Sequence, residues 1–173
     1  MTKTKITSIV FIVIYILLLS YFIIMGLEDS KKSQETSGKV EEIVTEVIDT
    51  VTPSDYQVSE ETVSVITRKV IGHFGYNVLM GIVLLLAIFF FLYLKIDLSD
   101  FGKGMIIIFA ITLALSFVMA IFSELIQLIP SGRSCEIKDM AIDFSGGALG
   151  AAISLVGCLV YLKTKNKKRD EVK

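Results

Sequence analysis

The sequence predicts an all-α integral membrane protein, a four-transmembrane-helix bundle with an external amphipathic helix between the first two spans. Composition is one basis, because 53% of the 173 residues are hydrophobic and only two are proline, and the mean hydropathy is +0.70. Length is the other, because a helix needs roughly 20 apolar residues to cross a hydrocarbon core about 30 Å thick. Four segments meet this requirement: Ile6–Met25, Ile71–Leu94, Met105–Ile129 and Met140–Leu162.

The spans divide the chain into four parts. Residues 1–27 form an N-terminal transmembrane anchor, residues 28–67 an external connection, residues 68–162 a core of three helices, and residues 163–173 a basic cytoplasmic tail. A cleaved signal peptide is the alternative for the first part. Its apolar run exceeds the roughly 7–15 residues of such peptides and no Ala-x-Ala-like site follows, which favours a retained helix.

Loop charges predict the orientation of the helices. Lysines precede the first span, flank the link between the second and third, and follow the fourth, and positively charged loops stay in the cytoplasm. The connection from Gly26 to Lys69 instead has ten acidic residues against five basic ones. We therefore expect a multi-pass protein of the plasma membrane, with this connection outside and both termini in the cytoplasm.

The external connection is expected to contain two helices. Residues 28–39 are polar and predict a flexible segment. Val40–Val51 has valine and isoleucine at three- and four-residue spacing, which predicts an amphipathic helix that ends before Pro53. We expect its apolar stripe to pack over the external mouth of the bundle; a solvated spacer helix is the alternative. Ser59 is a suitable N-cap for the second helix.

Two carboxylates lie in segments that are otherwise apolar, Glu124 near the end of the third span and Asp143 in the first turns of the fourth. A charged side chain at the bilayer centre costs at least roughly 2.5–3.5 kcal/mol, so it needs a partner, a polar interior or a function. Glu124 shares a helix face with Gln127, and Asp143 shares one with Asp139. Because the link between the helices is short, we expect both carboxylates at one depth on neighbouring helices.

The residues around these carboxylates predict a polar cup that opens outward. His73, the only histidine, would lie beneath its lip, and it shares a helix face with Lys69, four residues earlier. The alternative is structural: the carboxylates pair with arginine or lysine to hold the bundle together, and His73 is a hydrogen-bonded packing residue. Four basic residues would form the lip: Arg68, Lys69, Arg133 and Lys138.

The fourth span carries a face of small residues that includes Gly146 and Gly150. Such a face lets a neighbouring helix approach closely. We expect it to bring Asp143 toward Glu124, and a homo-oligomer through the same face is the alternative.

No cofactor is expected. Cys135 and Cys158 lie too far apart along the fourth helix to form a disulfide, and no Cys/His spacing suggests zinc. A divalent cation held by His73 and the carboxylates is the alternative. Nothing in the sequence points to nucleic acid as a partner.

A series of residues runs in order through the core: Arg68-Lys69, Gly72-His73-Phe74, Ser123-Glu124 with Gln127 before Pro130, Gly132-Arg133, Asp139, and Gly146 with Gly150. Together they resemble the VanZ-like family of small bacterial membrane proteins, which is named for a teicoplanin-resistance protein. The resemblance covers about residues 68–152 and the placement of the first helix. Two positions depart from the family pattern: Asp143 stands where relatives more often have asparagine, and Asn77 where an aromatic residue is common.

The resemblance implies low-level resistance to teicoplanin and related lipoglycopeptides, together with an action on lipid head groups proposed for a wider set of membrane enzymes. The substrate would be a lipid-linked head group at the outer leaflet, either a polyprenyl-phosphate, such as a lipid-linked cell-wall precursor, or a phospholipid. Glu124 would be the general base. His73, Asp143 and Asp139 would complete the catalytic site, and Arg133, Arg68, Lys69 and Gln127 would bind the substrate.

The alternative function is not enzymatic. A membrane protein that binds the drug or a surface lipid would limit how much antibiotic reaches its target, and it would use the amphipathic segment Val40–Val51 for this. A transporter is a third hypothesis, which four helices without an internal repeat do not favour.

Overall fold

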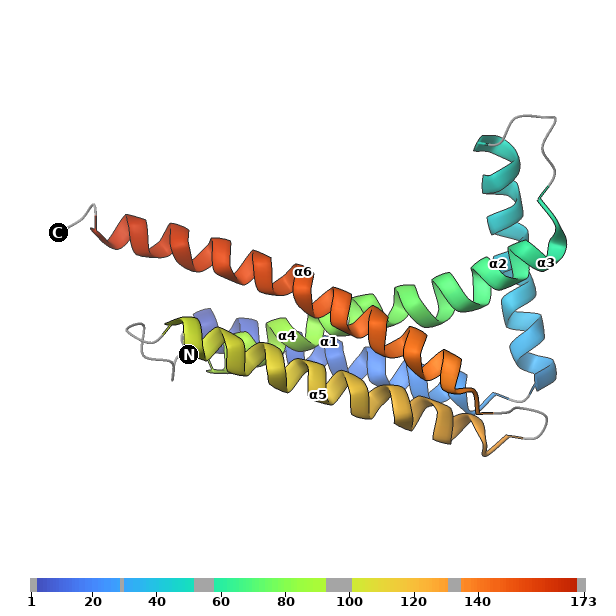
Figure 1. Ribbon diagram of the computed structural model, residues 1–173, viewed down its shortest axis with the longest axis horizontal. Helices are drawn as coiled ribbons and strands as arrows, with labels where there is room; N and C mark the ends of the chain where they lie inside the picture. Colours follow the sequence, from blue (N-terminus) through green and yellow to red (C-terminus); the bar gives the residue numbers. More distant parts are fainter. Residues whose placement is uncertain (1–2, 29, 52–57, 93–100, 131–134, 171–173) are drawn as a thin grey trace.

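The computed structural model describes residues 3–28, 30–51, 58–92, 101–130 and 135–170, and these ranges contain helices and no strand (Figure 1). Four of the helical stretches are long and apolar enough to cross a membrane: Thr4–Gly26, Glu60–Leu92, Gly102–Gln127 and Ile137–Lys165. The prediction of an all-helical chain with four helices long and apolar enough to span a membrane is thereby confirmed for the described residues. The elements are α1 (Lys3–Gly26), α2 (Ser30–Val51), α3 (Glu60–Val65), the π-helix η1 (Ile66–Gly75), α4 (Tyr76–Leu92), α5 (Phe101–Gln127) and α6 (Ile137–Asp170).

The second span is longer than predicted because α3, η1 and α4 follow one another without a break. Ser59 is the N-cap of α3, as predicted, and its side chain accepts a hydrogen bond from the backbone N–H of Thr62 at 3.3 Å. The helix therefore starts well before Ile71, the predicted start of the span. The middle of this continuous helix is the π-helical stretch η1, which carries Lys69 and His73.

The prediction of a flexible segment at residues 28–39 was wrong, because α2 begins at Ser30 instead of Val40. Local polar contacts hold its first turns: Lys32 pairs with Glu28 at 3.1 Å, and the hydroxyl of Thr36 donates to Glu28 at 3.4 Å. Polar residues here line a cavity at the end of the bundle. Their polarity therefore reflects what they face and does not indicate disorder.

The hydrophobic core lies in the part of the bundle away from α2, where the second half of α4, the first half of α5 and the later turns of α6 meet (Figure 1). The start of α1 and the end of α6 lie at this same end of the bundle. A buried polar cluster occupies the other end. Buried members of the apolar core are Leu85, Phe89, Met105, Ile108, Ala151, Cys158 and Leu162.

Close packing of α6 against η1 and α4 depends on glycine. A Cβ atom at Gly146 would overlap the backbone carbonyl oxygen of Phe74, and one at Gly150 would overlap that of Val78. Small residues allow this kind of backbone approach between membrane helices. This packing within one chain covers the small-residue face of α6 that the sequence also offers as an interface for a homo-oligomer. It also holds Asp143 beside η1.

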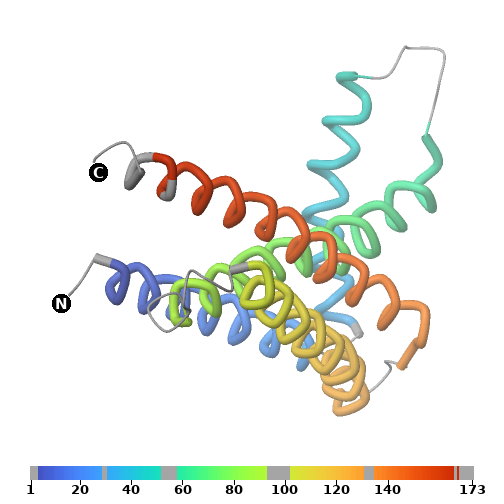
Figure 2. Tube along the Cα trace, turned by 60° about the vertical axis from the view of Figure 1, so that its left-hand side comes forward, coloured from blue at the N-terminus to red at the C-terminus, as the bar shows by residue number. Residues whose placement is uncertain are grey.

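Helix α2 runs across the end of the bundle instead of along it, and Figure 2 shows the same arrangement after a 60° turn (Figures 1 and 2). Its first half covers the bundle, and its second half extends beyond it. Val40 lines the cavity beneath the helix, whereas Ile43, Val47 and Val51 are exposed. Val40 is itself 37% exposed, and Val44 and Ile48, which belong to the same stripe, are half-buried. The expected packing of the apolar stripe over the bundle is thus found only in part.

Candidate functional site

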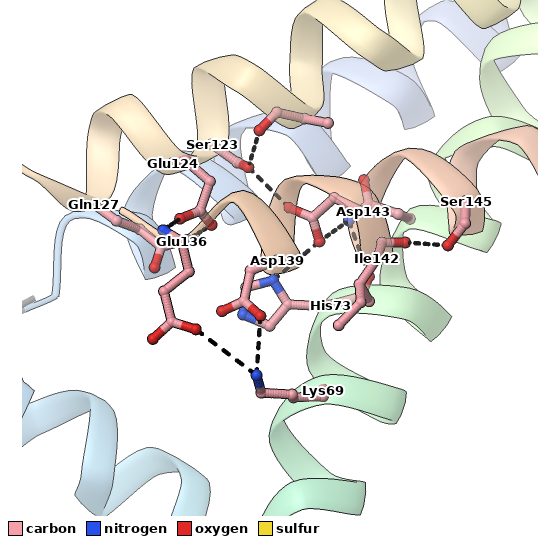
Figure 3. Close-up of polar contacts among 12 residues, drawn as sticks. Lys69, His73, Ser123, Glu124, Gln127, Glu136, Asp139, Ile142, Asp143 and Ser145 are labelled. Atoms are coloured by element: carbon pink, nitrogen blue, oxygen red, sulfur yellow. Dashed lines mark hydrogen bonds and ion pairs between the residues drawn. The ribbon is translucent and has the colours of Figure 1, made fainter. Parts of the chain in front are cut away.

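A buried polar cluster lies at the α2 end of the bundle, where η1, α5 and α6 meet (Figure 3). Asp143 on α6 is at its centre. The backbone geometry explains why these side chains meet: η1 and α6 are brought together by the glycine packing, and α5 contributes its last turns from the other side.

Asp143 is 1% exposed, and three donors surround its carboxylate. Oδ1 lies 2.9 Å from His73 Nδ1 and 2.9 Å from Asn77 Nδ2. Oδ2 lies 2.8 Å from Ser123 Oγ, whose single proton can serve either this oxygen or the backbone carbonyl of Ala120, also at 2.8 Å. A buried carboxylate that keeps its charge needs such a set of donors, because an unpartnered one would be very costly.

Glu124, the second buried carboxylate, is 0% exposed and joins α5 to the start of α6. Its Oε1 accepts a hydrogen bond from Gln127 Nε2 at 3.0 Å, so the predicted shared face is confirmed. Its Oε2 accepts from the backbone N–H of Glu136 at 2.8 Å. The predicted approach of the two carboxylates is also confirmed, because oxygens of Glu124 and Asp143 lie within 4.8 Å of each other.

Two side-chain pairs connect η1 with α6 in parallel. Lys69 Nζ lies 3.2 Å from Asp139 Oδ1, and His73 lies beside Asp143 four residues further along both helices. Lys69 Nζ is also 3.9 Å from an oxygen of Glu136. Although Asp139 Oδ1 is within ion-pair distance of Lys69, it makes no hydrogen bond of good geometry with any residue in the described part of the chain. This pairing fits the predicted shared faces of Lys69 with His73 and of Asp139 with Asp143.

A cavity of about 310 Å³ opens beside the cluster, between α1, α2, η1 and α5. Arg68, His73 and Gln127 are the residues of the predicted site that line it, whereas Glu124 and Asp143 lie behind this wall. Helix α2 adds small polar residues to its rim. Most of the remaining lining is apolar: Tyr21, Phe22, Met25, Ile71 and Ile126 are among its residues.

Thr67 also lines this cavity and is 5% exposed. Its hydroxyl has no hydrogen-bond partner among the described residues. A buried hydroxyl without a partner is costly, so it calls for an explanation such as a bound molecule.

The predicted site residues come together with one exception. Arg133 lies in residues 131–134, outside the described part of the chain. Sequence reasoning did not place Thr67, Asn77, Ser123 and Glu136 in the site. Asn77 and Ser123 carried a weak signal as polar residues in apolar helices, and Asn77 is also one of the two departures from the family pattern. The structure pairs these departures, Asn77 with Asp143.

Metal binding can be judged from the donor set. One ligand atom from each of His73, Glu124 and Asp143 lies within 4.8 Å of the others, and a nitrogen with carboxylate oxygens suits a divalent cation. Protein groups already donate hydrogen bonds to both carboxylates. Both carboxylates therefore have hydrogen-bond partners without an ion, and the geometry alone does not require one.

Comparison with known proteins gives one match. The family model described as VanZ/LLP1 matches residues 11–160. The match includes most of the first span and extends beyond the motifs found in the sequence. No curated protein and no solved structure matches the chain.

Proposed function

Since the chain belongs to the VanZ/LLP1 family, we propose that this membrane protein is an enzyme that acts on the phosphate of a lipid-linked head group. The substrate class is a polyprenyl-phosphate or a phospholipid at the outer leaflet. Low-level resistance to teicoplanin and related lipoglycopeptides would follow from the altered lipid.

The observation that carries this proposal is the position of His73. It lines the cavity, and Asp143 holds its Nδ1 from behind at 2.9 Å. Because the hydrogen bond at one ring nitrogen fixes the tautomer, Nδ1 keeps its proton and Nε2 presents a lone pair to a ligand. A histidine oriented by a buried carboxylate is the arrangement that general bases commonly have.

Arg68 and the lining of the cavity support a lipid phosphate as the ligand. Arg68 lines the cavity together with His73, and a guanidinium can bind two phosphate oxygens at once. The apolar part of the lining, from α1, η1 and α5, suits the first carbons of a lipid chain. Arg133, predicted as a second phosphate ligand, retains that role in the proposal.

In the proposed step, His73 takes up one proton and releases one. His73 Nε2 accepts a proton from a hydroxyl, either of water or of an acceptor molecule, as its oxygen forms a bond to phosphorus. The bond from phosphorus to the leaving oxygen breaks, and this oxygen takes the proton from the imidazolium. Asp143 stabilises the imidazolium and keeps the ring in place.

In this proposal Glu124 is not the general base that the sequence analysis predicts. Its two oxygens accept hydrogen bonds from Gln127 and the backbone of Glu136, and it does not line the cavity. We assign it the positioning of Gln127 and of the start of α6. The test below keeps Glu124 as the rival general base.

A non-enzymatic function is favoured by one observation, the largely apolar lining contributed by α1. A protein that binds a drug's lipid tail or a surface lipid would need this lining and would not need His73. The two functions therefore differ in what a change at His73 does.

The test uses purified protein in phosphatidylcholine vesicles that contain polyprenyl-phosphate or phosphatidylglycerol, with the lipids followed by mass spectrometry and released phosphate measured. We expect His73→Gln to lower turnover by about 100-fold or more, which is the contribution typical of general base catalysis. Asp143→Asn and Asp143→Ala should both lower turnover strongly, because each removes the negative charge that stabilises the imidazolium and holds the ring tautomer. Ser145→Ala, exposed on α6, is the matched control.

Three results would count against the proposal. If Glu124→Gln abolishes turnover and His73→Gln does not, Glu124 is the base. If His73→Gln leaves teicoplanin protection of a sensitive Gram-positive host unchanged at equal protein level, the binding function replaces the enzyme. If EDTA removes activity and a divalent cation restores it, the cluster of His73, Glu124 and Asp143 is a metal site.

A further inference from the structure

The second half of α2 presents apolar side chains that the rest of the described chain does not cover. Ile43 is 61% exposed, Val47 56% and Val51 74%. Isolated exposed apolar residues are common, but these repeat at four-residue spacing and form one stripe.

The face that carries this stripe is the face that α2 turns toward the bundle. Ser33, Ser37 and Val40 in the first half line the cavity at the end of the bundle. Val47 and Val51 continue the same line at spacings of seven and four residues, so they lie on the same side of the helix. The opposite side has Glu42, Thr45 and Asp49, which border a second hollow shared with the start of α3.

The direction of α2 relative to the spans shows what lies beneath this face. The spans run along the bundle and α2 crosses its end in both views (Figures 1 and 2). A membrane crossed by the spans must therefore lie parallel to α2. Beyond the edge of the bundle, the bundle-facing side of α2 is turned toward the surface of that membrane.

We propose that the second half of α2, from Ile43 to Val51, lies in the head-group region of the bilayer with its valine and isoleucine stripe inserted. Helices of this amphipathic kind bind at the interface through apolar burial and through attraction between basic residues and anionic lipid. The polar face here has Glu42, Glu46 and Asp49 in place of lysines. Attachment must then come from apolar burial, and it does not require anionic lipid.

This surface would hold α2 at a fixed height over the cavity, because the first half of the same helix forms part of the cavity wall. The proposal concerns the membrane itself and does not depend on the enzymatic function. Burial of the stripe by a second copy of the chain or by a soluble partner would be a different outcome, and the experiment distinguishes it from insertion in the bilayer.

Tryptophan fluorescence gives the test, because the chain has no tryptophan. Val47→Trp places one probe on the stripe, and Thr45→Trp places one at nearly the same position along the helix on the opposite face. Leu125→Trp, two residues before the end of α5 and 52% exposed, serves as the positive control for a tryptophan at the depth of the bromine atoms. Each full-length variant is reconstituted in phosphatidylcholine vesicles with and without lipids brominated near the glycerol.

Brominated lipid should lower the emission of Val47→Trp about two-fold or more and leave that of Thr45→Trp nearly unchanged, as expected for a helix lying in the interface. The same result should hold without anionic lipid. Unquenched emission from Val47→Trp would overturn the proposal: at long wavelength it means a solvated stripe, and at short wavelength a stripe covered by protein. Equal quenching of both variants would also overturn it, because the helix would then have no preferred side toward lipid.

Discussion

Thr67 shows how much a single buried group can indicate. Thr67 lines the cavity, and its hydroxyl is buried and has no hydrogen-bond partner among the described residues. Leaving such a group unpaired costs about 1–3 kcal/mol. A ligand that supplies a hydrogen bond would recover this free energy, so we expect the hydroxyl to contact the head group.

Thr67→Val should therefore change stability and binding in opposite directions. Removing the unpaired hydroxyl should raise the free energy of unfolding of the empty protein by about 1 kcal/mol. The stabilisation by added polyprenyl-phosphate should fall, because the ligand loses a hydrogen bond. Both effects are measured as Tm in detergent with and without the lipid.

Thr112→Val is the matched control for Thr67→Val. Thr112 is equally buried, but its hydroxyl donates to the carbonyl of Ile108 at 2.8 Å. Its substitution should leave the lipid-dependent shift in Tm unchanged. If Thr67→Val also leaves that shift unchanged, Thr67 does not contact the ligand.

At the scale of elements, the site depends on how η1 and α6 pack. The helix that carries Lys69 and His73 is π-helical over Ile66–Gly75, a form that is rare and frequent at functional sites. The two pairs, Lys69 with Asp139 and His73 with Asp143, require the two backbones to lie close together. Glycines at 146 and 150 make that distance attainable.

Gly150→Ala should destabilise the bundle, because its Cβ would overlap the carbonyl oxygen of Val78 on α4. Forcing a methyl group into a well-packed contact costs about 1–3 kcal/mol. Gly157→Ala on the same helix meets nothing within 4 Å, and its better helix propensity should make it neutral or stabilising by up to about 1 kcal/mol. Thermal or denaturant unfolding in detergent compares the two, and equal stability would show that the α4–α6 contact is looser than described.

At the scale of the molecule, the two ends of the bundle differ in chemistry. One end holds the polar cluster, the cavity and α2, and the other holds the apolar core together with the start of α1 and the end of α6 (Figure 1). Loop charges predict that the second end faces the cytoplasm. A site for a head group of the outer leaflet needs this orientation.

Cysteine labelling tests the orientation. In a background with Cys135→Ser and Cys158→Ala, Lys39→Cys on α2 should react with a membrane-impermeant maleimide on intact cells. Thr164→Cys near the end of α6 should react only after the membrane is permeabilised. The reverse pattern would place the cavity on the cytoplasmic side and exclude an outer-leaflet substrate.

Much of the site could be predicted because helix periodicity is a local property. Spacings of three and four residues correctly placed Gln127 beside Glu124. They also put Lys69 and His73 on one helix face, and Asp139 and Asp143 on another, as the structure has them. The polarity of residues 28–39, by contrast, gave the wrong result, because serine and threonine are as suitable for lining a cavity as for a loop.

By itself the sequence determined the four spans and the residues of the polar cluster, because the bilayer fixes helix length and makes each buried charge conspicuous. Only the tertiary structure decided which side chains are hydrogen-bond partners. His73, Asn77 and Ser123 contact Asp143, whereas Glu124 accepts from Gln127 and from the backbone of Glu136. Those choices depend on how each helix is rotated and how closely it approaches its neighbours. Rotation and approach are set by the packing of all the helices at once, which no local pattern contains.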